Sequence, residues 1–463
     1  MSEEALPASG AAAAEIFAAW TAGLGEDGVP PPVRAAAANA LLDQVGLAVS
    51  ARGEDYVRAV LESWTEEGGC TAFGHARGLD VAGAALVNGT AAHGEDYDDT
   101  FEGTPVHTSA VIVPAVLAAC ERFGRSGADL LRGMAVGAEL MCRMALVAPT
   151  AQHRAGFHPT AVIGALGAAA GVGAALRLPR QALVDALGVA GSMASGIIEY
   201  LAEGTWTKRL HPGWAAQAGI RAALLGAKGF RGPRTVLEGI NGFYSAFGVE
   251  GIPRDYTHIT AGLGEVWRVE RIAFKPFACG TMAQPFIDCA IRLAEQGVDP
   301  ERIEAVRCRV GEGTVHRLWE PIGEKRRPST PYSAKFSVPF CVAVGFLDRA
   351  AGLGQFTEAR IRDPRVLALA AKVAYEVDPA DEYPRNYSGH VIVRLSDGTV
   401  REERQPHLRG GAREPLSRAA LRAKFRANVL HGGWDEARAA ALERCCDGLF
   451  EAADLSGLAQ FRA

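Results

Sequence analysis

Residues 161–176 place the strongest constraint on the fold, because this stretch carries no charged side chain and consists mostly of alanine and glycine. It falls short of the ~20 apolar residues that a helix needs to cross a bilayer. Gly164, Gly167 and Gly171 recur at three- and four-residue spacing, which places them on one face of a helix. A face without side chains lets a second helix approach closely, so we predict a buried helix in a tightly packed helical core.

The first two-thirds of the chain shows helical periodicity almost throughout, with nearly no strand signals. Pro30, Pro31 and Pro32 precede the first long periodic run, as prolines commonly do at helix starts. Besides the Gly/Ala helix, the predicted helices here cover residues 33–51, 109–123, 128–147, 181–194, 215–226 and 234–238. This pattern indicates a large all-helical domain.

The pattern changes near residue 268. Residues 268–274 look extended, and residues 303–310 alternate between apolar and polar as a strand does. Asp397-Gly398 lies between two short apolar runs and supplies the positive φ angles of a tight hairpin turn. Further helices are predicted at residues 286–296, 335–347, 364–373, 416–428 and 434–452. We therefore predict a mainly α protein, with a large all-α domain at residues 1–274 plus 406–463 and a smaller inserted α+β lid domain at residues 275–405.

The overall charge argues against nucleic acid as a partner. The formal net charge is −5, whereas binding to DNA or RNA needs a basic surface. Nine cysteines are scattered without a CxxC pair, which is typical of reduced thiols in a cytosol. The first residues, MSEEALPASG, lack a basic segment followed by an apolar one. We accordingly expect a cytoplasmic protein without a membrane partner.

The densest polar segment is residues 93–100, HGEDYDDT, which is followed by His107. Its four carboxylates repel one another unless several face water or meet cations. The residues alone leave three interpretations open. The segment is an acidic, solvated loop, or a metal site that combines His93 with the carboxylates, or a place where one carboxylate orients and charges a histidine for acid–base chemistry.

Three further segments carry imidazole or ammonium groups beside apolar residues. His158 directly precedes the Gly/Ala helix, where the helix dipole favours an anion. Lys208 and His211 lie together next to an apolar run, and Lys275 lies between two phenylalanines. Each has a structural alternative: a contact at a helix start, a solvated corner, or a lysine whose stem covers an apolar surface. A partly buried lysine is a strong point charge for a carboxylate.

Taken in order, these segments resemble the MmgE/PrpD family, which includes 2-methylcitrate dehydratase, cis-aconitate decarboxylase and iminodisuccinate epimerase. The motifs that carry the resemblance are NGTAAH at 88–93, DYDDT at 96–100, FHP at 157–159, TK at 207–208, LH at 210–211, FK at 274–275, PLS at 415–417 and KF at 424–425. Each motif is short, but their order along nearly the whole chain makes the set specific. The resemblance implies a helical domain and a smaller α+β lid with the site between them, a homodimer, and no metal or organic cofactor.

The resemblance also implies a role for each matching residue. His107 corresponds to the general acid/base beside the reacting carbon, and His158 to the second histidine. Asp96 and Thr100 correspond to residues that shape the floor of the pocket. The residues that would bind the carboxylates of the substrate are Lys208, Lys275 and, as a further candidate, His211. The catalytic set implied in this way is Asp96, His107, His158, Lys208 and Lys275.

The function predicted first is a hydro-lyase, similar to 2-methylcitrate dehydratase, that removes a proton α to a carboxylate of a small hydroxylated di- or tricarboxylic acid. An isomerase, epimerase or decarboxylase of a related acid is the alternative, because one arrangement of base and cations can serve all of these reactions. An extra residue between Thr100 and His107, and Val315 or His316 at the position of a tyrosine in the decarboxylase, argue against decarboxylation. His316 thereby becomes a candidate for substrate binding. A metal-dependent hydrolase and a non-catalytic scaffold are the remaining alternatives.

Overall fold

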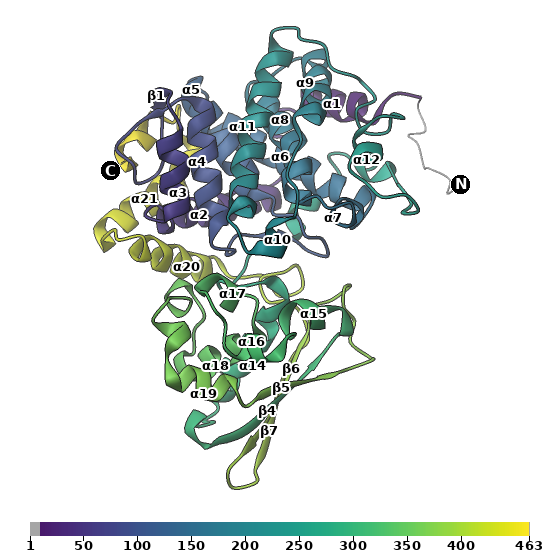
Figure 1. The fold of residues 1–463 in the computed structure, drawn as a ribbon. Coiled ribbons are helices and arrows are strands. Elements are labelled where there is room, and N and C mark those ends of the chain that lie inside the picture. Colours follow the sequence, from purple (N-terminus) through teal and green to yellow (C-terminus); the bar gives the residue numbers. More distant parts are fainter. Residues whose placement is uncertain (1–9, 463) are drawn as a thin grey trace. The chain divides into compact units, whose positions relative to one another are not determined.

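The computed structural model describes residues 10–462 (Figure 1). Helix makes up 56% of the structure and strand 9%, which confirms the prediction of a mainly α protein. The chain divides into two compact units. The first contains the residues up to Gly94, Asp98–Ile272 and the residues from Arg418 on, and the second contains Glu95–Tyr97 and Ala273–Ser417. The predicted lid at residues 275–405 lies within the second unit, and its action as a lid stays a prediction.

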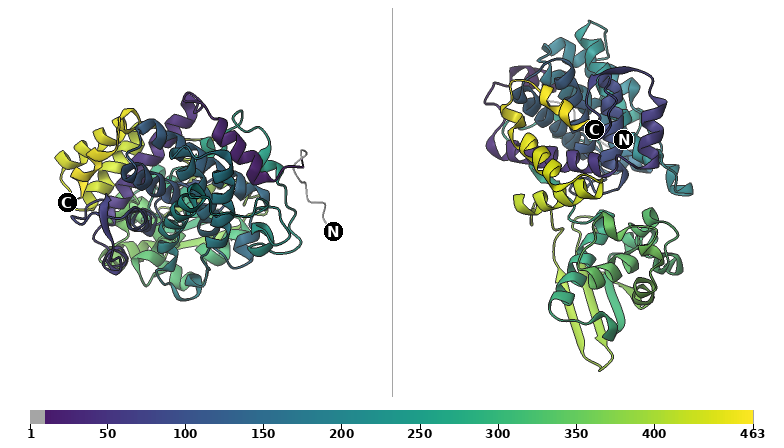
Figure 2. Two further views of the ribbon diagram at one scale, coloured as in Figure 1. Left: turned by 90° about the horizontal axis from the view of Figure 1, so that it is seen from above. Right: turned by 90° about the vertical axis from the view of Figure 1, so that its left-hand side faces the viewer.

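The first unit is built from helices, which Figure 2 shows from two further directions. They are α1 (Ala13–Gly23), α2 (Pro31–Ser50), α3 (Asp55–Ser63), α4 (Val81–Gly94), α5 (Ser109–Arg122), α6 (Gly127–Val147), α7 (Ala151–Arg154), α8 (Pro159–Ala175), α9 (Arg180–Met193), α10 (Tyr200–Glu203), α11 (Thr207–Ala227), α12 (Phe243–Ala246), α13 (Thr257–Thr260), α20 (Arg418–His431) and α21 (Glu436–Gly448). Two short strands, β1 (Glu67–Cys70) and β2 (Thr100–Phe101), interrupt them, and β3 (Ile272–Ala273) lies where the chain enters the second unit.

Helix α8 is the Gly/Ala segment, and every one of its residues is buried. It packs against α5, α6, α9 and α11. A Cβ atom on Gly171 would lie 2.8 Å from the carbonyl oxygen of Gly133, and one on Gly137 would lie 2.9 Å from that of Gly167. Because no side chain fits at these crossings, the backbones of α6 and α8 come close together. The prediction of a buried helix with a close helix contact is confirmed.

Helix α11 begins earlier than the sequence indicated. The prediction placed its start at Ala215. Pro212 lies before that residue and has no N–H group to donate inside a helix. The structure continues the helix through this proline, back to Thr207. As a result, Lys208 and His211 lie on the first turns of a long helix and are held by its packing.

Three other predictions for the first unit were wrong in detail. Residues 234–238 form turns and not a helix. Residues 268–274 are extended only in β3, because a 3₁₀ helix, η1 (Arg268–Arg271), precedes it. Strands β1 and β2 were missed, since so few residues cannot show a clear alternation.

The second unit combines helices with one four-stranded sheet of order β5-β4-β6-β7. Its helices are α14 (Gln284–Glu295), α15 (Val315–Leu318), α16 (Ile322–Arg326), α17 (Pro331–Ala334), α18 (Val338–Asp348) and α19 (Pro364–Ala370). Its strands are β4 (Ile303–Val310), β5 (Val373–Val377), β6 (Gly389–Leu395) and β7 (Val400–Gln405). Strand β4 runs parallel to β5 and antiparallel to β6. Helix α14 packs against β6 and β7.

The hairpin of β6 and β7 confirms the turn prediction, and Gly398 has the positive φ of 84° that the turn needs. Strand β5 was missed, because the predicted helix at residues 364–373 was drawn through its first residue. In the structure that helix ends at Ala370, and Val373 pairs with Val306 of β4. A single valine at the end of a predicted helix does not indicate that the following residues pair with a parallel strand far away in the sequence.

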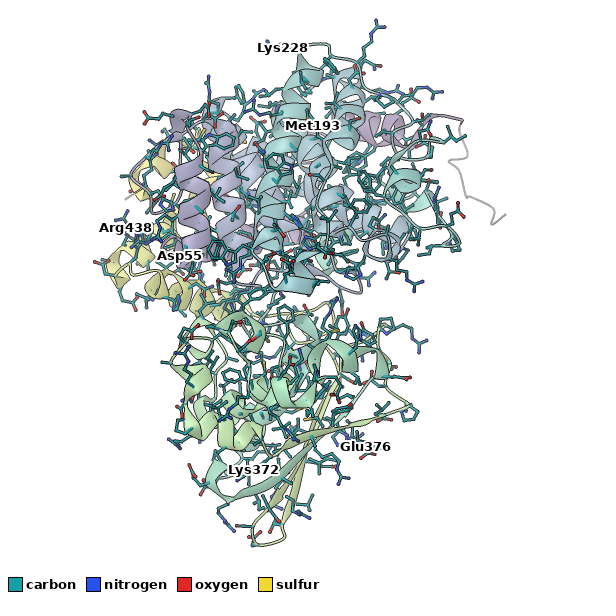
Figure 3. All side chains as sticks on the ribbon, in the orientation of Figure 1. Asp55, Met193, Lys228, Lys372, Glu376 and Arg438 are labelled. Atoms are coloured by element: carbon teal, nitrogen blue, oxygen red, sulfur yellow. The ribbon has the colours of Figure 1, made fainter. Side chains whose placement is uncertain are left out.

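Both units expose charged side chains to solvent. Asp55 and Lys228 in the first unit, and Lys372 and Glu376 in the second, are exposed to solvent (Figure 3). All nine cysteines carry free thiols. Within residues 10–462, none of the helices has the length and apolar character required to span a bilayer.

Candidate active site

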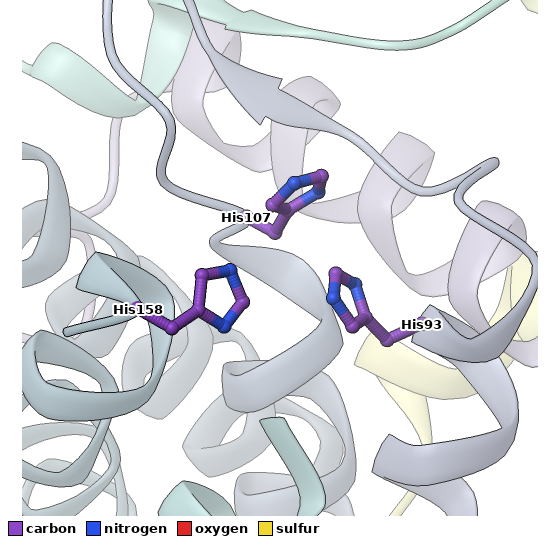
Figure 4. Close-up of side chains that lie close together, drawn as sticks. All are labelled: His93, His107 and His158. Atoms are coloured by element: carbon purple, nitrogen blue, oxygen red, sulfur yellow. The ribbon is translucent and has the colours of Figure 1, made fainter. Parts of the chain in front are cut away.

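Three histidine rings face one another inside the first unit (Figure 4). His93 lies near the end of α4, His107 in the segment before α5, and His158 directly before α8. Their exposed fractions are 1%, 7% and 3%. One ring nitrogen from each lies within 4.8 Å of those of the other two. We call these three residues the histidine cluster.

The local fold holds the histidine cluster in place. The backbone N–H of His107 donates a 3.0 Å hydrogen bond to Oγ1 of Thr160 on α8, which ties the segment before α5 to the start of α8. The rings of His93 and His107 meet edge to face, with centroids 4.6 Å apart. The rings of His93 and His158 are stacked at 5.8 Å. Side chains packed in this way have little freedom to turn away from one another.

Asp98 lies behind two of these rings and is fully buried. Its Oδ2 atom lies 2.7 Å from Nδ1 of His93 and 3.1 Å from Nδ1 of His107. Burial by itself raises the pKa of Asp98, but the adjacent His107 and His93 together hold it well below its usual range. The carboxylate is therefore ionised, and it places a negative charge beside both rings.

His158 has a different partner, His211 on α11. The two Nδ1 atoms lie 3.0 Å apart, so one ring donates a hydrogen bond to the other. Burial, the neighbouring histidines and the charge of Lys208 hold the pKa of His158 well below its usual range. Burial, His93 and Lys208 lower the pKa of His211 to about 4. Both rings are therefore neutral near pH 7, and the half-buried Lys208 lies close enough to influence both.

A hollow opens beside His211. Its volume is about 510 Å³, and its lining includes Gly196, Tyr200, Glu203, Leu210, His211 and Trp214. The hollow is large enough for a small organic acid. It lies wholly within the first unit, next to the hydrogen-bonded pair of His158 and His211.

The acidic segment is not a solvated loop, so the first interpretation of these residues was wrong. Asp98 and Asp99 are both fully buried, and Asp96 is 3% exposed. Glu95 forms an ion pair with Lys335 inside the second unit. Each carboxylate therefore has a cation, a histidine or a hydrogen-bond donor beside it, which offsets the cost of burial.

Asp96 and Lys275 pair with each other in the second unit. The Nζ atom of Lys275 donates hydrogen bonds of 2.8 Å to both the main-chain oxygen and Oδ1 of Asp96. Tyr332 donates a 3.3 Å hydrogen bond to Oδ2 of the same carboxylate. Thr100 is buried in β2 of the first unit, and His316 is exposed on α15 of the second. The roles of these residues in binding substrate stay predictions.

Two residues of the cluster region were not in the predicted site. The sequence placed His93 only in a possible metal site, and it left open which carboxylate of the segment orients a histidine. In the structure, Asp98 contacts His107. The sequence did contain a signal for these residues, because His93, Asp96 and Asp98 all belong to the dense polar segment at residues 93–100. Spacing alone could not decide which carboxylate points at a histidine.

The groups best able to hold a metal ion in residues 10–462 are the imidazoles of the histidine cluster. The predicted metal site combined His93 with several aspartates. In the structure, Asp98 contacts the Nδ1 atoms of His93 and His107, which is where an outer-shell carboxylate lies in many metal sites.

The pKa of Asp99 is unusually high for an aspartate. Burial, followed by the charges of Asp98 and Asp43, raises the pKa of Asp99 to about 7. Its two oxygens accept hydrogen bonds from Nε2 of Gln44 at 3.0 Å and from the backbone N–H of Ser109 at 3.3 Å. A buried carboxyl group of this kind couples the stability of the first unit to pH.

We expect Asp99→Asn to stabilise the protein at pH 8 but not near pH 4. The ordinary pKa of an aspartate is 3.8, and that of folded Asp99 is about 7. Between these values only the unfolded chain loses the proton, so the folded state loses stability as pH rises, by at most roughly 4 kcal/mol. Asparagine stays neutral and removes this loss. Urea unfolding at both pH values, with the exposed Asp55→Asn as control, checks this; an equal effect at both pH values would contradict it.

Comparison with known proteins identifies the family. The model of the MmgE/PrpD N-terminal domain matches residues 15–252, and that of the MmgE/PrpD C-terminal domain matches residues 277–448. The chain therefore belongs to the MmgE/PrpD family, as the sequence motifs indicated, and it is an enzyme of that family.

Several relatives are cis-aconitate decarboxylases. The chain is 31% identical to the enzyme of Mus musculus over 75% of this chain and 71% of the relative. It is 28% identical to the enzyme of Aspergillus terreus over 95% of this chain and 93% of the relative. The enzyme of Homo sapiens is 31% identical over 75% of this chain and 72% of its own length. These relatives are carboxy-lyases by name and not dehydratases, so the predicted carbon–oxygen lyase activity stays a proposal.

Proposed function

We propose that this protein is a lyase that transfers a proton at the carbon next to a carboxylate of a small polycarboxylic acid. One observation carries the proposal: the imidazole of His107 lies in the buried histidine cluster with the ionised carboxylate of Asp98 at its Nδ1. A histidine supported by a carboxylate is a common general acid/base. The neutral His158 and the cation of Lys208 complete a set suited to an anionic substrate.

The mechanism follows from where charge develops. When a proton or CO₂ leaves the carbon next to a carboxylate, negative charge spreads onto that carboxylate, and a preorganised cation stabilises it without reorganising. We assign this role to Lys208. His107 exchanges the proton with the carbon, and Asp98 stabilises the imidazolium form of the ring. His158, held by His211, is positioned to hydrogen-bond a second polar group of the substrate.

Decarboxylation of a cis-aconitate-type acid is the first candidate for the overall reaction. In this reaction CO₂ departs, and the electron pair left on carbon takes a proton from His107, which must begin as imidazolium. The contact with Asp98 favours this form. The names of the relatives support the same reaction.

Hydration and dehydration form the second candidate, together with isomerisation. Here His107 removes a proton from carbon, and hydroxide leaves the neighbouring carbon as water after a second proton transfer. The observations that favour this candidate are the extra residue between Thr100 and His107 and the absence of a tyrosine at Val315 and His316. If the proton returns to the other face, the reaction is an epimerisation.

A single assay separates these reactions. The EDTA-treated protein is incubated in D₂O with cis-aconitate, citrate, 2-methylcitrate and iminodisuccinate, and products are followed by NMR and by CO₂ release. Release of CO₂ with one deuterium on the product carbon supports decarboxylation. Exchange of water between a hydroxy acid and its alkene supports the hydro-lyase. Absence of both turnover and deuterium exchange with every acid would reject the proposal.

We expect Lys208→Ala to raise KM by roughly 10–100-fold, since a hydrogen bond to a charged group contributes about 1.5–3 kcal/mol. We expect kcat to fall as well, because Lys208 also stabilises the negative charge that develops on this carboxylate in the transition state. Initial rates over a range of substrate concentrations measure both constants. The control is Lys228→Ala, which removes an exposed lysine from the same unit. Unchanged KM and kcat in Lys208→Ala would exclude the role.

We also propose a cytoplasmic homodimer that needs no organic cofactor, as the family resemblance implies. Light scattering coupled to gel filtration measures the mass of the particle in solution. A mass equal to one chain of 48.7 kDa at micromolar concentration would exclude the dimer.

A further inference from the structure

We propose that the histidine cluster is a binding site for one divalent transition-metal ion of the Zn²⁺ type, with the imidazoles of His93, His107 and His158 as ligands. Imidazole nitrogens suit Zn²⁺, Co²⁺, Ni²⁺ and Cu²⁺, whereas Mg²⁺ and Ca²⁺ prefer oxygen ligands. The site is independent of the proposed function, because binding of the ion needs only the three side chains and their supports.

The ligand atoms are close to the required distances. Three ring nitrogens lie within 4.8 Å of one another. With Zn–N bonds of about 2.0–2.1 Å and tetrahedral angles, ligand nitrogens lie about 3.3 Å apart. Binding of the ion therefore requires the three ring nitrogens to move closer together than the 4.8 Å limit within which they lie in this structure.

One of the three candidate ligand residues has a buried nitrogen that lacks a hydrogen-bond partner. The Nε2 atom of His93 is buried and makes no hydrogen bond within the described residues. The other nitrogen of the same ring, Nδ1, lies at hydrogen-bond distance, 2.7 Å, from Oδ2 of Asp98. A buried polar atom without a partner is costly. A metal ion in the centre of the histidine cluster would satisfy it.

The residues behind the rings match the usual support of metal ligands. Asp98 contacts the Nδ1 atoms of His93 and His107, and His211 contacts that of His158. Since each Nδ1 atom already lies against one of these groups, we assign the Nε2 atoms as the metal-binding nitrogens. Carboxylates in this position orient metal-binding histidines and make them more basic, and their loss typically weakens binding about 10–100-fold. The negative charge of Asp98 also offsets the charge of the ion.

If the proposed function holds, the ion is an inhibitor of this enzyme. His107 cannot exchange a proton with substrate while its nitrogen is bound to metal, and the same ion occupies His158. Zn²⁺ should then suppress turnover and EDTA should restore it. This consequence depends on the proposed function, but the existence of the site does not.

The test measures binding without substrate. The full-length protein is treated with EDTA, desalted and titrated with ZnCl₂ by calorimetry, and with CoCl₂ by visible absorption. We expect one ion per chain, and a Co²⁺ spectrum with the intense bands of a four-coordinate ion. His93→Gln should weaken Zn²⁺ binding at least tenfold, and Asp98→Asn about 10–100-fold. His258→Gln, which removes a half-exposed histidine of the same unit, should leave binding unchanged.

Thermal unfolding distinguishes a variant that has lost the metal site from a variant that fails to fold. Zn²⁺ should raise Tm of the native protein and of His258→Gln but not that of His93→Gln or His158→Gln, because only a folded site binds the ion. Absence of saturable Zn²⁺ binding to the native protein would overturn the inference. So would equal affinity in His93→Gln and the native protein. Metal binding without any lyase activity would reject only the proposed function, and activity without metal binding would reject only the metal site.

Discussion

Replacing His107 by alanine is expected to lower kcat by roughly 10²–10⁴-fold, the usual contribution of a general acid/base. The ring of His107 is the member of the histidine cluster that combines a contact with the ionised Asp98 with the greatest exposure of the three. The protein should still fold, because the substitution leaves α4, α5 and α8 intact. Steady-state rates and thermal unfolding measure the two effects separately.

The control for this experiment is His258→Ala, which lies in the same unit outside the histidine cluster. It should retain nearly full turnover. A His107→Ala protein that turns over substrate within a few-fold of the native rate would show that another group exchanges the proton. His158→Ala would then be the next variant to examine.

The largest expected loss of stability follows the replacement of Glu139 by leucine. Glu139 and Arg143 form an ion pair on α6, and each side chain is 1% exposed. Removing one partner of a buried pair leaves an uncompensated charge and typically costs about 3–5 kcal/mol.

The surroundings of the pair explain why the loss should be large. Arg143 also donates to the carbonyl oxygens of His258, Ala261 and Val266, at 2.9, 2.8 and 2.7 Å. Glu139 accepts from the backbone N–H groups of Arg268 and Val269. Without the carboxylate, these two amides lose an acceptor and the guanidinium loses its counter-ion. The segment at residues 258–269 would then be held to α6 more weakly, by Arg143 alone of this pair.

Urea unfolding of Glu139→Leu measures this loss. The control is Asp55→Ala, which breaks an ion pair with Arg58 whose side chains are 69% and 59% exposed. Exposed pairs contribute little to stability. A Glu139→Leu protein as stable as the native chain would mean that leucine packs well enough to replace the whole network.

Local pattern predicted the regular elements where the pattern was long. The glycine spacing of α8, the periodicity of α2, α5 and α6 and the alternation of β4 all appear at the expected residues. Prediction failed where a distant partner or a long helix decides the local structure. Strand β5 exists because it pairs with β4, and α11 continues through Pro212 because its surroundings hold it. Tertiary contacts override local preference in both cases.

By itself the sequence determined that this protein is mainly helical, that it belongs to the MmgE/PrpD family, and that His107 and His158 are candidates for its chemistry. Only the tertiary structure decided which groups these histidines meet. Asp96 and Asp98 are two positions apart in the printed sequence, yet one pairs with Lys275 and the other with His93 and His107. The reason is physical: Asp96 has a positive φ of 56°, so the chain turns sharply there, and the direction of each side chain depends on that turn and not on residue type.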